Sequence, residues 1–246
     1  MPVEQHFWFA RILNDLLGGL VTALMTKAGL PPSNPHYPIP DYVGGEVLVL
    51  LLIVAGAIIL RSRLSVENPG KLQHAMEIFL EFTQGLVDEM IGHGARQYVP
   101  LIGTLGLFIV ICNILGLIPT FITPTASIQV PLGCAIMVFI HYNFQGIRQH
   151  GILGYIRHLC GPMMGIAIIM LPTEILSNVL RMLSLSVRLW ANMLVGGILE
   201  SVFTGLVPIA VPAIFMVLHI FESFLQAYVF MILPALYISL ATAEEH

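Results

Sequence analysis

The chain has 246 residues, of which 57% are hydrophobic and 10% are charged. A water-soluble domain of this length needs about a quarter of its residues charged to stay solvated, so the composition excludes a soluble globular protein and indicates residence in a bilayer. The formal net charge of −4 leaves no basic surface for nucleic acid, and no GxxxxGK[ST] phosphate loop occurs. We therefore expect no nucleic-acid partner and no direct nucleotide binding.

The first predicted element belongs to an N-terminal interfacial segment, residues 1–41. From His6 to Lys27 apolar residues recur at helical spacing, with Arg11 and Asp15 one turn apart on another face, which predicts an amphipathic interfacial helix. A proline-rich stretch, 31–40, ends this helix. No positive charge precedes the apolar stretch, so the segment is not expected to be a cleavable secretory signal.

The remaining chain, residues 42–246, is predicted to form one transmembrane domain. The apolar run 42–60 has Glu46 near its start, and residues 97–147 contain no Lys, Arg, Asp or Glu, which suffices for two spans with a turn at the Pro119–Pro124 cluster. With two further apolar arms after Pro172, the expected spans are 42–60, 98–118, 126–146, 166–206 and 213–242.

A helix lying on the membrane surface is predicted between the first two spans, after a turn at Asn68-Pro69-Gly70. Its two opposite stripes are Leu72, Met76, Phe79, Leu86 and Met90 on the apolar side, and Glu77, Glu81, Gln84 and Asp88 on the polar side.

The last two spans are predicted to form a helical hairpin with a turn at Pro208 and Pro212. The apolar part of its first arm, 173–206, is about 51 Å long as a helix, whereas the hydrocarbon core is about 30 Å thick, so the arm must be steeply tilted or kinked. The pair Gly196-Gly197 marks either a bend or a place where a neighbouring helix packs closely. The expected fold class is an all-α integral membrane protein with about five transmembrane helices, a long tilted C-terminal hairpin and amphipathic surface helices.

Basic residues predict the orientation. Arg61, Arg63, Lys71 and Arg96 lie between spans one and two, Arg148 and Arg157 follow span three, and the turn between spans two and three has no basic residue. The positive-inside rule puts the first two segments in the cytoplasm, the N-terminus outside and the tail 243–246 inside.

Five ionisable residues interrupt the apolar hairpin: Glu174, Arg181, Arg188, Glu200 and Glu222. A charge at membrane depth costs from about 2.5 to more than 10 kcal/mol, so several together suggest ion transport. Glu174, Asn178, Arg181, Leu185, Arg188 and Asn192 follow steps of four and three along one helix face, and His219, Glu222 and Gln226 do so on the second arm.

Structural roles are the alternative for some of these residues. Arg181 can pair with Glu174 through neighbours or extend to an interface, and a lone membrane histidine can simply bond to backbone. Arg188 is the strongest single case, because its neighbours Leu185, Val187, Leu189 and Trp190 are apolar and no acid lies three or four residues away, so its partner is expected on another chain.

Three segments carry a resemblance to a known family. The run Ser184-Leu-Ser-Val-Arg188-Leu-Trp-Ala-Asn192-Met resembles the signature around the essential arginine of the F-type ATP synthase a subunit, S-x-x-x-R-L-x-x-N-x. Leu225-Gln226-Ala-Tyr-Val-Phe230 resembles the final-helix segment of that family, and Asn113-Ile-Leu-Gly-Leu-Ile-Pro119 resembles its second-span motif. Residues 1–95 match in layout alone.

The resemblance implies a non-catalytic proton-channel subunit of an ATP-synthesising complex in the energy-transducing plasma (inner) membrane. The implied partners are a c-subunit ring, a b-subunit peripheral stalk and lipid. Arg188 would face the ring carboxylate, while Asn192, His219 and Gln226 would line an outer half-channel and Glu174 with Ser177 an inner one. A sodium-translocating version of the same subunit and an independent secondary transporter are the alternatives.

Two departures from the family pattern weaken the implied outer relay. Gly197 stands where many relatives carry Glu or His, and Gly116 stands where some bacterial relatives have Asp. Glu222, which shares a face with His219 and Gln226, is the predicted replacement acid, with Glu200 in reserve. The cysteines Cys112, Cys134 and Cys160 lie in or beside apolar runs, and we expect no metal site and no cofactor.

Overall fold

A computed structural model describes residues 7–27, 29, 34, 37–65, 69–92, 94–118, 121, 123–160, 167–206 and 210–242. The predicted turn residues Asn68, Pro119 and Pro208 and the tail 243–246 lie outside this set. The described α-helices are α1 (Trp8–Lys27), α2 (Asp41–Ser62), α3 (Lys71–Ile91), α4 (Val99–Leu115), α5 (Gln129–Cys160), α6 (Ala167–Leu206) and α7 (Ala210–Thr242). Two short 3-10 turns, η1 (Ala95–Gln97) and η2 (Pro124–Ala126), flank α4.

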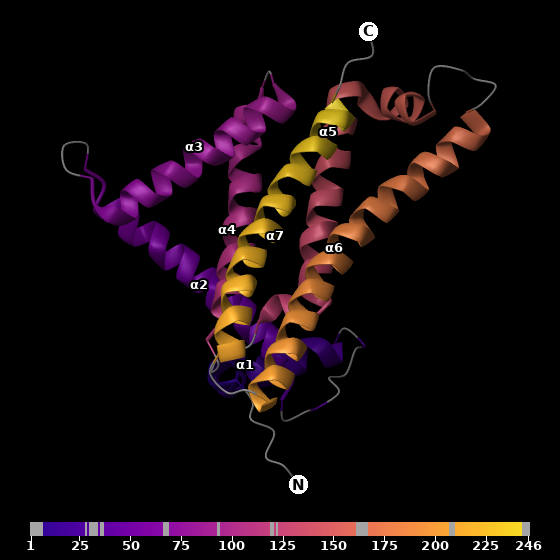
Figure 1. The fold of residues 1–246 in the computed structure, drawn as a ribbon. Helices are drawn as coiled ribbons and strands as arrows, with labels where there is room; N and C mark the ends of the chain where they lie inside the picture. Colours follow the sequence, from indigo (N-terminus) through magenta and orange to yellow (C-terminus); the bar gives the residue numbers. More distant parts are fainter. Residues whose placement is uncertain are drawn as a thin grey trace.

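Helix α7 is the centre of the bundle. It contacts α3, α4, α5 and α6, and α6 packs beside it as the other arm of the predicted hairpin (Figure 1). The core between these helices consists of large apolar side chains that are fully buried, among them Ile102, Ile109, Leu185, Leu189, Phe230 and Ile238. Because no strand occurs in the described residues and the exposed surface of the long helices is apolar, the predicted all-α integral membrane fold is confirmed.

Helix α6 is 40 residues long, or about 60 Å at 1.5 Å per residue, and it runs obliquely across the bundle (Figure 1). It begins before Pro172, and the hydroxyl of the next residue, Thr173, donates to the carbonyls of Ile169 and Met170 at 3.0 and 2.9 Å, so the proline is accommodated. The helix continues unbroken through Gly196 and Gly197. The arm is therefore tilted as predicted, whereas the glycine pair does not interrupt the helix.

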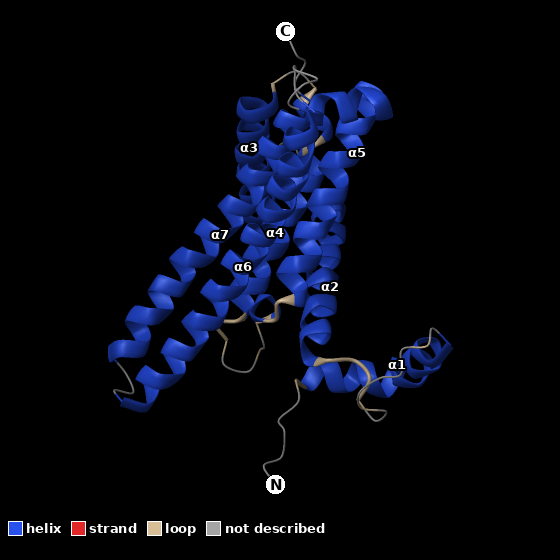
Figure 2. Ribbon diagram, turned by 90° about the vertical axis from the view of Figure 1, so that its right-hand side faces the viewer, coloured by secondary structure: helices blue, strands red, loops and turns tan. Residues whose placement is uncertain are grey.

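Five described helices are long and apolar enough to cross a membrane, by length and composition: α1, α2, α5 up to Gly151, most of α6, and α7. The 17-residue α4, predicted as span two, is shorter than these, and α1, predicted as interfacial, is included. The positions of these two helices suggest the opposite of their lengths. The shorter α4 lies within the bundle, while the longer α1 lies crosswise at its foot (Figure 2). The five spans from the sequence stay a prediction.

Helix α5 contains a sharp break at Gly151, whose φ of 69° and ψ of 167° are not helical. The helix therefore extends past the predicted end at residue 146, and its final segment turns away at the same end of the bundle as the C-terminus (Figure 1). A hydrogen bond of 2.8 Å from the Tyr155 hydroxyl to Asn143 Oδ1 ties this segment back to α5.

Helix α3 is amphipathic, as predicted, and packs against α4 and α7. Leu86 is buried and Met76, Phe79 and Met90 are half-buried, while the acidic side chains of the opposite stripe are exposed. Leu72 departs from the prediction because it lies at the free end of the helix, where no neighbour covers it, and is 57% exposed.

The N-terminal segment docks on the start of α2 through polar contacts. The amide of Asn14 both donates to and accepts from the backbone of Ile39, each at 2.9 Å, and Asp41 Oδ1 accepts from the backbone N–H of Phe7 at 3.1 Å. Burial, followed by the neighbouring Asp41, raises the pKa of Tyr37 to about 12, so its hydroxyl stays protonated and donates to Asp41 at 2.9 Å.

A close approach of α1 to α2 depends on Gly44. A Cβ at this position would lie 2.7 Å from the Cβ of Ala10, whereas a Cβ at Gly56, further along α2, would meet nothing within 4 Å. We predict that Gly44→Val separates α1 from α2 and destabilises the protein by about 1–3 kcal/mol, as overpacking does elsewhere. The midpoint of thermal unfolding in detergent checks this, and an equal effect of the control Gly56→Val would contradict the docking.

Candidate functional site

The polar row predicted along α6 opens, from Glu174 to Arg188, into two neighbouring cavities, while Asn192 lines a third. Thr173, Leu176, Ser177, Leu180, Arg181, Ser184, Leu185, Arg188, Leu233 and Tyr237 line an open groove of about 480 Å³. A smaller cavity of about 40 Å³ beside it is lined by Tyr142, Tyr155, Glu174, Asn178, Arg181, Tyr237, Leu240 and Ala241. Arg181 and Tyr237 form the wall common to both, so Glu174 and Ser177 open into neighbouring spaces.

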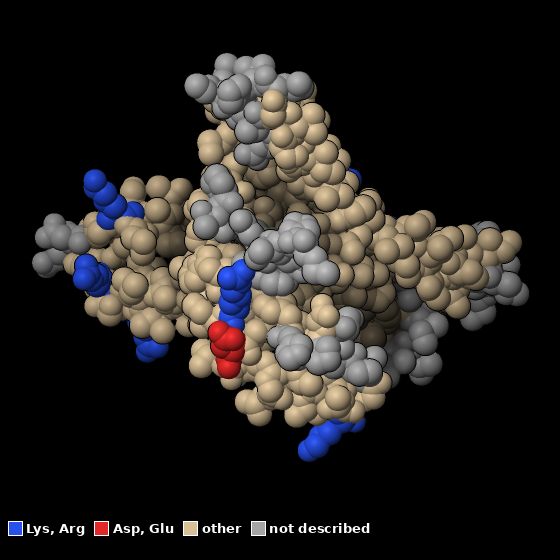
Figure 3. Space-filling model, turned by 90° about the horizontal axis from the view of Figure 1, so that it is seen from below, with Lys and Arg blue, Asp and Glu red and all other residues tan. Residues whose placement is uncertain are grey.

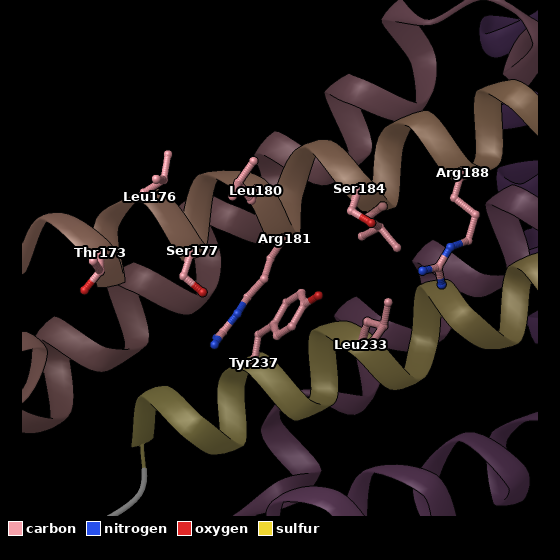
Figure 4. A pocket seen from close by; sticks show the side chains of 10 residues that line it. Thr173, Leu176, Ser177, Leu180, Arg181, Ser184, Arg188, Leu233 and Tyr237 are labelled. Carbon is pink, nitrogen blue, oxygen red and sulfur yellow. The ribbon is translucent and has the colours of Figure 1, made fainter. Parts of the chain in front are cut away.

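Arg181 has partners within the chain. Its Nη2 lies 4.0 Å from Oε1 of Glu174, and its guanidinium lies over the ring of Tyr237, 5.6 Å from the ring centroid. Figure 4 shows the two side chains next to each other in the space between α6 and α7. The long separation and partial exposure make the ion pair weak, but the contacts hold the guanidinium in place.

Arg188 has no such partner among the residues that the structure describes. Its side chain is exposed and reaches toward α7 in Figure 4, at the end of the groove furthest from Thr173. None of the described acidic residues lies within ion-pair distance of it. The residues around it on α6, including Leu183, Val187 and Val195, are exposed apolar side chains. A permanent charge therefore stands on an apolar surface that no part of the described chain covers.

A third cavity, of about 270 Å³, begins one turn beyond Arg188. Its lining residues are Ala191, Asn192, Val195, Gly196, Leu199, Phe215, Leu218, His219 and Glu222. The structure thus brings Asn192 of α6 together with His219 and Glu222 of α7. The side chain of Glu200 lies outside the described residues.

His219 and Gln226 point into the protein. His219 is 7% exposed and Gln226 is 1% exposed, and none of the described side chains or backbone groups pairs with His219 Nε2 or Gln226 Oε1. Ser223, between them on the same face of α7, donates to the His219 carbonyl at 2.7 Å. Gln226 does not line the cavity that contains His219 and Glu222, because it lies deeper in the bundle.

Gly196 makes the position of His219 possible. A Cβ on Gly196 would lie 3.1 Å from His219 Nδ1, whereas a Cβ on Gly197 would meet nothing within 4 Å. Of the two interpretations of the glycine pair, close packing of the neighbouring helix is therefore the one that holds, and it applies to Gly196.

Sequence reasoning missed the tyrosines of the small cavity. Tyr142 and Tyr155 belong to α5, on either side of its break at Gly151, and Tyr237 belongs to α7, so no spacing rule along one regular helix connects the three. Within the described residues no group of His, Cys, Asp or Glu is arranged to hold a metal ion.

The fold and the site define an integral membrane protein in which ionisable side chains line cavities along a helical hairpin. The sequence matches the ATP synthase A chain family over residues 46–239. It is 44% identical to the ATP synthase subunit a of Koribacter versatilis (strain Ellin345), over 99% of this chain and 100% of the relative. The identity is 42% to that of Solibacter usitatus (strain Ellin6076), over 96% of this chain and 100% of the relative.

A further subunit a, from Sulfurihydrogenibium sp. (strain YO3AOP1), is 41% identical over 72% of this chain and 86% of the relative. The chain therefore belongs to the ATP synthase A chain family. The family match begins within α2, well before the first of the motifs that carry the resemblance.

The two glycines provide a matched test of the geometry. We predict that Gly196→Val displaces the His219 imidazole, lowers unfolding stability by about 1–3 kcal/mol and reduces ATP-driven acidification of vesicles. Gly197→Val should affect both much less, because its side chain would enter open space. Thermal unfolding and acidification are measured on the two assembled variants, and equal effects at both positions would show that His219 does not depend on this contact.

Proposed function

We propose that this chain is the proton-translocating stator subunit of an F-type ATP synthase. In this scheme two offset half-channels carry protons to and from a ring of carboxylate-bearing c subunits, which pass Arg188 in turn. The observation that carries the proposal is the position of Arg188, an uncompensated charge between a groove on one side and a separate cavity on the other.

The exposed face around Arg188 supports a ring of apolar helices as the partner. An arginine cannot lose its proton at any accessible pH, and its charge at membrane depth is costly unless it is paired. Since no described acid of this chain pairs with it, a carboxylate on the partner satisfies the charge. The apolar side chains that surround Arg188 on α6 suit contact with the lipid-facing side of such a ring.

The groove and the small cavity form the proposed inner half-channel. Glu174 and Ser177 offer oxygen atoms that can hold water and exchange protons, and both are half-buried rather than sealed in the core. Arg181, held by Glu174 and Tyr237, would keep this passage open and attract hydroxide or carboxylate rather than cations. Under the positive-inside rule this end faces the cytoplasm.

The third cavity forms the proposed outer half-channel. His219 and Glu222 are its titratable groups, and Asn192 and Gln226 contribute polar atoms along the path. Glu222 takes the place of the acid that is absent at Gly197. Glu200, on the same arm as Gly197, is a reserve candidate.

Rotation follows from the offset between the two passages. Beside Arg188 a passing carboxyl has its pKa lowered by about 1–3 units, so it releases its proton and remains charged while it is next to the guanidinium. Away from Arg188, desolvation favours protonation and allows the neutral carboxyl to move into lipid. Because neither passage crosses the whole membrane, a proton can cross only by riding on the ring.

The rest of the assignment follows from this role. The chain would act without a catalytic site of its own, bind no nucleotide, and contact the c-ring, a b-subunit stalk and lipid in the energy-transducing plasma (inner) membrane. Its N-terminus would lie outside and its C-terminus in the cytoplasm. Seen from the end proposed to face outward, the described atoms in view are mostly uncharged, with a few separate basic and acidic side chains among them (Figure 3).

The two arginines of α6 give the sharpest test. We predict that Arg188→Ala abolishes ATP-driven proton pumping while the complex still assembles, and that passive proton leak rises because nothing separates the two passages. The control Arg181→Ala should retain a substantial part of the pumping, since that charge is already paired within the chain. Acidification of inverted vesicles measures both, and normal coupled pumping by Arg188→Ala would remove the basis of the proposal.

A second prediction concerns the outer passage. Glu222→Gln should lower ATP synthesis and ATP-driven pumping severalfold, because it removes a titratable group beside His219, and Glu200→Gln should do so less. Adding Gly197→Glu to Glu222→Gln should restore part of the rate. The new acid would stand next in sequence to Gly196, which lines the cavity of His219 and Glu222. Proton flux is measured across pH in vesicles stripped of the catalytic head. An unchanged flux and pH profile in Glu222→Gln would mean that this carboxylate is structural.

A further inference from the structure

The proposed mechanism leaves one membrane-depth carboxyl unused. Glu46 lies five residues beyond the start of α2, about 7.5 Å along the helix axis, on the side of the helix that packs on the bundle. Its neighbours Gly45 and Val49 on that side are buried, and Glu46 itself is half-buried. The described part of the chain contains no basic group within ion-pair distance of it.

The surroundings of Glu46 come from α4 and α5. The thiols of Cys112 on α4 and Cys134 on α5 both lie within electrostatic range of the Glu46 carboxyl, and neither cysteine is in a disulfide. Asn113 follows Cys112 in the chain. The Glu46 carboxyl therefore lies near the C-terminal end of α4, which carries Asn113.

Asn113 belongs to a buried polar pair at that end. Its Oδ1 accepts a hydrogen bond of 2.6 Å from the hydroxyl of Thr125 in η2, and both residues are completely buried. Among the described groups, none accepts a hydrogen bond from the amide nitrogen of Asn113, Nδ2. Since η2 contacts both α2, which carries Glu46, and α6, this pair lies where α2, α4 and the hairpin meet.

The packing register leads from Asn113 to α7. Helices α4 and α7 run antiparallel (Figure 1), and Gly106 packs directly against Met231. Asn113 is seven residues, or about two turns, further along α4, which brings it level with the α7 segment between Ser223 and Gln226. Asn113 Nδ2 is a buried donor and Gln226 Oε1 a buried acceptor at the same level, and buried polar atoms of this kind normally hold ordered water.

Positions 116 and 197, where relatives carry an acid or a histidine in the outer half-channel, are both glycine in this chain. A side chain at Gly116 would overlap Thr123, so that position has no room for a carboxylate, and Gly197 has none. We propose that Glu46 is a proton-carrying carboxyl of the outer half-channel, connected through water held by Asn113 and Gln226 to His219 and Glu222. This proposal rests on the proposed function of the chain.

The proposed step is the transfer of one proton along a chain of hydrogen bonds. The Glu46 carboxylate takes a proton from outer water, the neutral carboxyl gives it to a bound water, and the proton passes along the hydrogen-bonded chain to His219 or Glu222. Asn113 and Gln226 keep their protons and orient the water. The carboxylate is then restored for the next proton, and no bond other than those to hydrogen changes.

The test compares Glu46→Gln with Glu46→Asp in vesicles that hold the assembled membrane complex stripped of its catalytic head, so that the ring is free to turn. Passive proton flux from the outer side should fall severalfold in Glu46→Gln and return most of the way in Glu46→Asp, which keeps an acid at the same place. Unchanged flux in Glu46→Gln, or an equal loss in both variants, would overturn the proposal and leave Glu46 a structural residue.

The native thiols give a second measurement that requires no change at Glu46. Silver ions added to the outer side should reach Cys112 or Cys134 through the proposed water path and block flux in the wild-type complex, while the double variant Cys112→Ala/Cys134→Ala should resist. If neither glutamate variant assembles, failure of silver to block the wild type would overturn the proposal. These outcomes are separate from the Arg188→Ala experiment, whose result decides the proposed function itself.

Discussion

Arg188 sets the constraint on which the rest of the structure depends. A guanidinium at membrane depth can neither lose its proton nor leave its helix, and no described acid of the chain neutralises it. Its charge must therefore be compensated by water in the adjoining groove and by a partner outside the chain. The uncovered apolar surface around it, and the cavities that end on either side of it, are consistent with that single requirement.

The scaffold meets this requirement by fixing α6 firmly against α7. Large apolar side chains of both helices are fully buried in one core shared with α4, and small residues permit close approach where polar groups must meet. Gly196 leaves room for the His219 ring, and Gly106 leaves room for Met231. The lower ends of α6 and α7 extend away from the other helices (Figure 2), so the hairpin presents a long face to a neighbouring subunit while its middle stays rigid.

The N-terminal region is attached differently from the hairpin. It is held by hydrogen bonds from Asn14 to Ile39 and from Phe7 to Asp41 and by the close approach of Ala10 to Gly44. The aromatic rings of Phe7 and Trp8 reach Phe121, 5.7 and 6.3 Å away between centroids. Phe121 precedes η2, which holds Thr125 against Asn113. The segment outside the family match is thus connected to the polar cluster between α2 and α7.

Residue types and helical spacing were enough to predict the fold class and the tilted hairpin and to single out Arg188, because charges within long apolar runs are rare and their spacing on one helix follows from its pitch. The sequence also offered Arg181 a partner in Glu174, seven residues away on the same face, and offered none to Arg188. The packing of the helices was needed to show that Arg181 pairs with Glu174 and Tyr237, that Gly196 rather than Gly197 receives a neighbour, and that Glu46 lies near the thiols of α4 and α5. These facts depend on the register and rotation between helices distant in the chain, which the packing of complete side chains sets and helical periodicity does not encode.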